Sequence, residues 1–112
     1  MKANEFVKKY GISRAKQILK YSDKNHRYFI ADGISTTYSK YSDGFYSLKD
    51  LEQIIEAHEI IGLFKSLDHA KAEAQACEQS KHSEILVKLN AGVGYIWLSR
   101  VKQAIKDVES CQ

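Results

Sequence analysis

The chain has 112 residues, and its 44% apolar and 28% charged content is typical of an ordinary globular protein rather than a disordered one. This length predicts a single domain, residues 1–112, built on one modest core. The longest apolar run, IIGLF at residues 60–64, is far shorter than the roughly 20 residues of a membrane helix, which argues against a membrane span. Cys77 and Cys111 lie far apart in a chain that starts without an apolar leader, so we expect reduced thiols and a cytoplasmic protein.

Charge is divided unevenly along the sequence. Up to Lys40 there are nine Lys or Arg against three Asp or Glu, whereas from Tyr41 onward there are eight against eleven. A segment of net charge +6 is therefore joined to one of −3, and such a division favours a binding role over a catalytic one. Because the chain contains no proline, its turns must be made by glycine, Asp-Gly pairs and helix caps.

Two short basic helices are predicted at the start, on either side of Gly11. Asn4 is expected to cap the first helix and Ser13 the second. The second helix has an apolar stripe at positions i, i+3 and i+4, formed by Ala15, Ile18 and Leu19.

Between residues 27 and 46 the pattern is that of a sheet. Asp32-Gly33 and Asp43-Gly44 are favoured hairpin turns among β-branched and aromatic residues, which predicts a three-stranded antiparallel meander. Its middle strand, near residues 34–41, would place on one face Ile34, Thr36 and Tyr38.

Three further helices are predicted after the sheet. Ser47 and Ser66 are expected to cap the first two. The final helix is expected after a turn at residues 90–94, with an inward stripe that starts at Trp97. Residues 80–89 fit either a strand or a buried helical turn. The predicted fold class is α+β, with two short N-terminal helices, a small three-stranded antiparallel sheet and three helices packed on one core.

Three blocks of the sequence resemble small, largely uncharacterised accessory proteins of lambdoid-type phages and prophages. The blocks are MKANEFVKKYG at residues 1–11, SLKDLEQIIEAHEII at residues 47–61 and KQAIKDVESC at residues 102–111. The resemblance implies a setting in an infected host cell, and it implies no site residues. Accessory proteins of this kind commonly bind and inhibit host machinery, including nucleases and CRISPR-type defence complexes.

The residues expected to contact a partner are basic side chains of the first segment and two tyrosines that could act as anchors. They are Lys8, Lys9, Arg14, Lys16, Lys20, Lys24, Arg27, Tyr38 and Tyr41. The tyrosines are as readily explained as ordinary packing residues of a small sheet.

The leading interpretation is a non-catalytic protein that binds and inhibits a host protein or nucleoprotein complex. The alternative is a small DNA-binding regulator with a helix-turn-helix-like segment at residues 4–20, although Gln17 and Lys20 occupy positions where such motifs bury apolar residues. No cofactor is expected. His58 lies amid an apolar helix stripe with no partner for proton transfer, and Cys77, His82 and Cys111 lack the paired spacing of zinc ligands.

Overall fold

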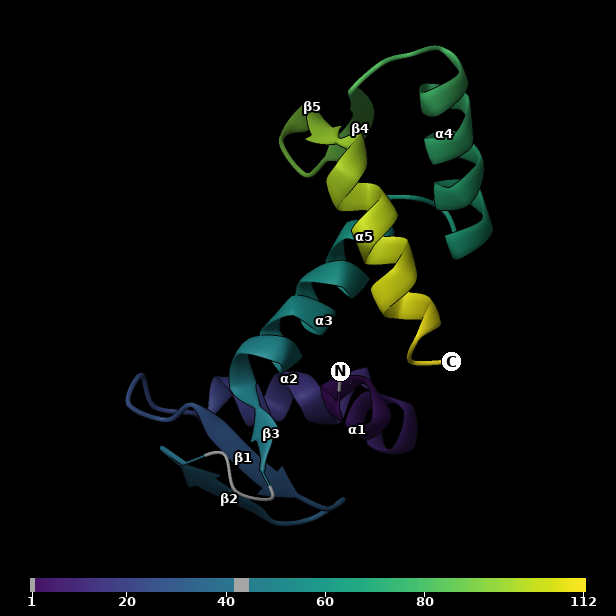
Figure 1. Cartoon of the computed structure of the whole chain (residues 1–112). Helices are drawn as coiled ribbons and strands as arrows, with labels where there is room; N and C mark the ends of the chain where they lie inside the picture. The colour runs from purple at the N-terminus through teal and green to yellow at the C-terminus, as the bar shows by residue number, and fades with distance from the viewer. Residues whose placement is uncertain (1, 42–44) are drawn as a thin grey trace. The chain divides into compact units, whose positions relative to one another are not determined.

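The computed structural model describes residues 2–41 and 45–112, and it is a mixed α+β fold (Figure 1). The described helices are α1 Lys2–Tyr10, α2 Ile12–Lys20, α3 Leu48–Ile61, α4 Leu67–Gln79 and α5 Leu98–Glu109. The described strands are β1 Tyr28–Ala31, β2 Thr36–Ser39, β3 Tyr46–Ser47, β4 Glu84–Leu89 and β5 Gly92–Trp97. The predicted class, the two N-terminal helices, the three-stranded sheet and the three later helices are confirmed.

The contacts divide the chain into two compact units. The first is Met1–Ile55 with Ser110–Gln112, and the second is Glu56–Glu109. Each unit has its own cluster of buried apolar side chains, whereas the sequence led us to expect one core. The helical period of α3 showed that one face is apolar, but it could not show that Leu51 and Ile54 join one cluster while Ala57 and Ile61 join another. The count of one domain stays a prediction.

In the first unit, α1 and α2 are joined by Gly11 alone. The Gly11 amide still donates a helical i→i−4 hydrogen bond to the Val7 carbonyl at 2.8 Å, and the non-helical backbone angles of Gly11 then end α1. Its φ of 89° lies in the left-handed region that glycine adopts without strain. The expected caps at Asn4 and Ser13 are wrong: Asn4 lies inside α1, and Gly11 is the N-cap of α2 with no side-chain hydrogen bond.

The three-stranded sheet is antiparallel, but it is not a meander. Its order is β2-β1-β3, so β1 is central and Phe29 pairs with Tyr38 on one side and Tyr46 on the other. Ile34 was expected in a strand and instead lies almost fully exposed in the turn, because its amide is held by the carboxylate of Asp32 at 2.7 Å. The Asp32-Gly33 turn does connect β1 to β2, and the Asp43-Gly44 turn lies outside the described residues.

The core of the first unit is built around aromatic rings. Phe6 and Phe29 are both fully buried and meet edge to face, with ring centroids 5.2 Å apart. Tyr46 packs on both rings, at 5.6 Å from Phe6 and 5.4 Å from Phe29. Aromatic pairs of this geometry add about 0.5–1.5 kcal/mol each beyond the area they bury. Leu51 and Ile54 of α3 complete this core.

In the second unit, small and aliphatic side chains fill the core instead. The buried side of α4 consists of Ala70, Ala74 and Cys77. Two ion pairs connect α4 to α5 in antiparallel order, Lys71–Glu109 at 3.0 Å and Glu78–Lys102 at 2.8 Å.

The predicted serine caps of α3 and α4 are confirmed. The Asp50 amide donates to Ser47 Oγ at 3.2 Å, and the His69 amide donates to Ser66 Oγ at 3.0 Å. Each hydroxyl satisfies one of the backbone amides that a helix N-terminus leaves without an intrahelical partner.

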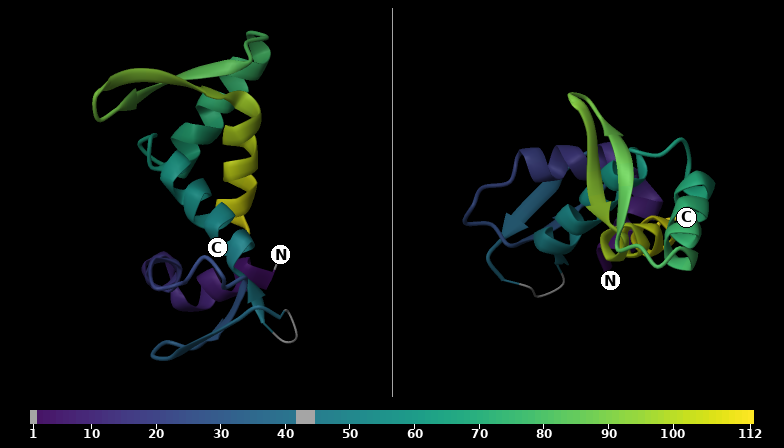
Figure 2. Two further views of the ribbon diagram at one scale, coloured as in Figure 1. Left: turned by 90° about the vertical axis from the view of Figure 1, so that its left-hand side faces the viewer. Right: turned by 90° about the horizontal axis from the view of Figure 1, so that it is seen from above.

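Residues 84–97 form an antiparallel hairpin of β4 and β5 that leads directly into α5 (Figure 2). Residues 80–89 were expected to form either a strand or a buried helical turn, and the strand is observed. Strand β5 was not expected at all. Trp97 was expected in the inward stripe of the final helix, and this is wrong: it ends β5 and is 55% exposed. Apolar residues occupy both faces of β5, so its sequence shows no alternation that would have revealed a strand.

Candidate basic binding surface

The outward side of α2 lines a shallow groove of about 610 Å³. Because Ser13, Lys16, Gln17 and Lys20 recur at intervals of three and four residues, they share this side of the helix. The other lining residues are Tyr10, Arg14 and Tyr21. None of the described residues that line the groove is an acid, and Lys16 and Lys20 are both exposed beside it.

Arg14 was predicted as a contact residue, and the structure directs its guanidinium toward the β1–β2 turn. Nη2 donates to Thr36 Oγ1 at 2.7 Å and to the Ser35 carbonyl at 3.2 Å, while Nε donates to the Asp32 carbonyl at 3.1 Å. Nη1 donates to Gln17 Oε1 at 3.0 Å. This fork holds α2 against the β1–β2 turn, and most of its donors are already occupied.

Tyr38, the second predicted residue with an internal role, is half-buried. Its hydroxyl donates to the Ile18 carbonyl at 2.7 Å, and its ring stacks on His26 with centroids 4.9 Å apart. Burial raises the pKa of Tyr38 above its ordinary value of 10.0, against a smaller opposing effect of the Arg14 charge, so the hydroxyl keeps the proton that it donates.

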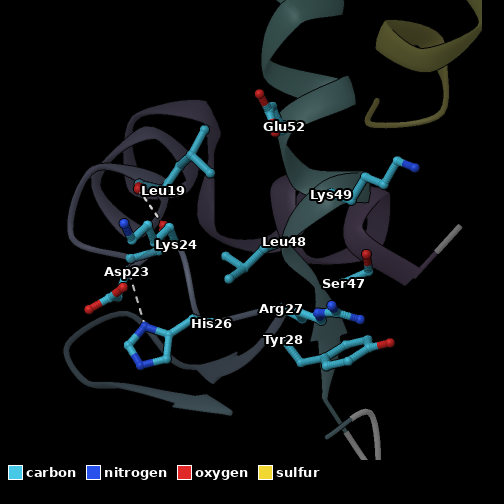
Figure 3. A pocket seen from close by; sticks show the side chains of 11 residues that line it. Leu19, Asp23, Lys24, His26, Arg27, Tyr28, Ser47, Leu48, Lys49 and Glu52 are labelled. Carbon is cyan, nitrogen blue, oxygen red and sulfur yellow. Dashed lines mark hydrogen bonds between the residues drawn. The ribbon is translucent and has the colours of Figure 1, made fainter. Parts of the chain in front are cut away.

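Lys24 and Arg27 lie together on a second cavity, of about 490 Å³ (Figure 3). Its walls come from the end of α2, the loop that follows, the start of β1 and the β3–α3 junction. Lys49 adds a third base, but Asp23 and Glu52 also line this cavity and offset much of its positive charge. Electrostatically it is therefore a weaker anion site than the groove on α2.

The remaining predicted residues are exposed. Lys8 and Lys9 lie on α1, where Lys9 Nζ is 5.3 Å from the centre of the Tyr10 ring. Tyr41 is exposed beyond the end of β2. The structure thus brings Arg14, Lys16 and Lys20 to one groove and Lys24 and Arg27 to another.

Sequence reasoning omitted Tyr21 and Lys49 from the contact residues. Tyr21 is 66% exposed, and Lys20 Nζ lies 5.7 Å from its ring centre. Its position directly after the last residue of α2 was a usable signal, because an aromatic residue just past a basic helix lies beside the side chains of the last turn. Nothing in the sequence separates Lys49 from the other lysines of the chain.

No family model matches the chain, and neither does any curated protein or solved structure. Within residues 2–41 and 45–112, no group of three His, Cys, Asp or Glu residues could hold a metal ion. No described helix is long and apolar enough to cross a membrane.

Proposed function

We propose that this protein is a non-catalytic accessory protein of phage type that inhibits a host complex by binding an anionic surface of that complex. The groove on α2, with Lys16, Lys20 and Tyr21, is the contact surface. The complex is a nuclease or a CRISPR-type defence assembly, and both kinds of machinery handle nucleic acid and expose phosphate.

The observation that carries the proposal is the excess of positive charge on the first two helices. Glu5 is the one acid between residues 2 and 20, whereas Lys8, Lys9, Lys16 and Lys20 are all exposed. Such a surface concentrates anionic partners and accelerates their association. Exposed Tyr21 adds an amphipathic ring of the type that is enriched at interface hot spots.

The geometry of α1 and α2 gives less support to a sequence-specific DNA reader. A helix-turn-helix joins its helices by a turn of about three or four residues, whereas Gly11 is the whole junction here. Arg14, the side chain of α2 best suited to bidentate recognition of a base, is held by the β1–β2 turn.

The test uses the purified chain to retain complexes from a host lysate. Reversal of Lys16 and Lys20 to Glu should abolish retention of the specific complex, because attraction becomes repulsion at the centre of the groove. The matched control reverses Lys65 and Lys106, which are also exposed, and should retain as much as the native chain. The activity of the retained complex should fall when the native chain is added, and it should not fall with the Lys16 and Lys20 variant.

Two outcomes would overturn the proposal. Equal retention by both double variants would remove the α2 groove from the interface. Nanomolar binding to one duplex DNA sequence at physiological salt, with affinity that falls steeply as salt rises, would establish the regulator instead.

A further inference from the structure

The β4–β5 hairpin exposes an apolar face that no described part of the chain covers. Side chains alternate along each strand, so Glu84, Leu86 and Lys88 of β4 share a face with Val93, Tyr95 and Trp97 of β5. We call this set the outer face. Its four apolar members are largely solvent-exposed: 56% for Leu86, 69% for Val93, 70% for Tyr95 and 55% for Trp97.

The opposite face of the hairpin already has its partners. Ile85, Val87 and Ile96 are buried and belong to the core of the second unit. The exposure of the outer face is therefore not explained by the packing of the hairpin within its own unit. Four neighbouring apolar side chains that remain exposed on one face are a feature of interaction sites.

Charge on the outer face is balanced and placed at its two ends. Glu84 lies opposite Trp97 at one end, and Lys88 lies opposite Val93 at the other. Neither charged side chain forms an ion pair with any residue that the structure describes. A platform for single-stranded nucleic acid needs net positive charge along the backbone track, which this face lacks.

We propose that the outer face binds the outer face of a second copy of this chain. The two copies are related by a two-fold axis that lies midway between the two outer faces. The axis runs perpendicular to the strands at the level of Leu86, so the strands of the second copy run in the reverse direction. Leu86 and Tyr95 are paired across the hairpin and lie at this level. Each therefore meets its own counterpart in the second copy.

The same operation brings together groups that suit one another at both ends. Glu84 of one copy meets Lys88 of the other, twice by symmetry. The large Trp97 meets the smaller Val93, also twice. The face is thus complementary to itself in charge, in size and in polarity, as an isologous dimer interface requires. Stacked sheets of this kind lie about 10 Å apart with their strands within about 30° of alignment.

The first measurement is the concentration dependence of the native chain's mass, by sedimentation from about 1 µM to about 1 mM, a range that covers weak interfaces of small area. Because Trp97 is the one tryptophan of the chain, its emission should shift to shorter wavelength as the dimer forms and buries it. A chain that stays monomeric throughout, or a dimer that leaves the Trp97 emission unchanged, overturns the proposal. An emission shift that requires an added oligonucleotide assigns the face to nucleic acid instead.

The second measurement tests the arrangement with two charge reversals. Glu84→Lys places a new lysine against Lys88 of the other copy, and Lys88→Glu places two glutamates together, so each variant alone should dimerise about tenfold more weakly. In an equimolar mixture, a Glu84→Lys chain that meets a Lys88→Glu chain has opposite charges at both facing pairs of positions. Heterodimers should therefore form in preference to either homodimer. Absence of this preference in the mixture would overturn the two-fold arrangement.

A third comparison separates loss of binding from loss of folding. Leu86→Lys should weaken the dimer about tenfold or more, because it buries a charge at the centre of the interface. The matched control is Ile34→Lys, which replaces an exposed aliphatic residue in the β1–β2 turn and should leave the dimer unchanged. Equal dimerisation of the two variants would remove the outer face from the interface.

Discussion

The two units of this chain bury and expose opposite kinds of residue. The first, with ten Lys or Arg against six Asp or Glu, buries aromatic rings and exposes lysines. The second, with seven bases against eight acids, buries alanine, valine and isoleucine and exposes the aromatic side of a hairpin. Because a binding surface consists of the residues left outside the core, the two proposed surfaces differ in kind: one is positively charged and the other is largely apolar.

The largest expected effect comes from the aromatic core. Phe29→Ala should lower the free energy of unfolding by about 3–5 kcal/mol, because it removes a fully buried ring that contacts Phe6 and Tyr46. Val101→Ala, at a fully buried position of the second unit, should lower it by only about 2 kcal/mol. Urea unfolding of both variants measures the difference, and equal losses would contradict the contrast between the two cores.

Arg14 tests whether every positive charge of the first unit serves binding. Arg14→Lys keeps the charge but loses the fork that reaches Ser35, Asp32 and Thr36, so it should destabilise the protein by about 1–2 kcal/mol. Lys16→Arg, on the exposed side of the same helix, is the control and should leave stability unchanged. Thermal unfolding decides between them: a stable Arg14→Lys variant would return Arg14 to the contact surface.

The β1–β2 turn should make the first unit sensitive to acid. Hydrogen bonds from the Ser35 and Ile34 amides hold the pKa of Asp32 below its ordinary value of 3.8. Since the folded pKa is the lower one, the stability that ionised Asp32 contributes is full above that ordinary value and is lost as pH falls through the folded pKa.

Unfolding of the native chain and of Asp32→Asn, followed between about pH 6 and about pH 2, measures this contribution. The native chain should be the more stable of the two at the upper end of this range, and the difference should vanish at the acid end. A difference that stays constant with pH would show that the carboxylate charge is not involved.

The smallest expected effect lies in the second unit, at the end of α4. Lys81 has φ of 59° and occupies the position after the C-cap, where the His82 amide donates to the Cys77 carbonyl and the Lys81 amide to the Glu78 carbonyl. Lys81→Gly should stabilise the protein by about 0.5–1 kcal/mol, because glycine adopts this conformation without strain. Lys81→Ala removes the same charge but keeps the Cβ atom, so a gain with alanine as well would refute the conformational explanation.

Elements governed by local rules were predictable from the sequence. The caps at Ser47 and Ser66 and the turn at Asp32-Gly33 depend on residues at most three positions apart, and all three are present. The sheet order β2-β1-β3 was not predictable in this way, because it depends on which distant strand pairs with β1.

The candidate site was predictable in composition but not in orientation. The sequence identified Lys16 and Lys20 as basic residues of a helix face, and both line the groove. It could not show that the side chains of Arg14 and Tyr38 bind within the unit, since their partners at Thr36 and Ile18 lie 20 or more residues away along the chain. Strand β5 was missed because its apolar residues also fit a helical stripe.

Each unit contains one thiol, and the two differ in accessibility. Cys77 is buried in the second unit, with Sγ 3.3 Å from the His82 carbonyl oxygen, whereas Cys111 is half-buried in the first. An alkylating reagent can reach Cys77 only when the second unit opens locally, while Cys111 reports on the first. The two thiols are thus separate reporters of local opening. Equal or unequal alkylation rates under the same conditions would show whether the two units open together or separately.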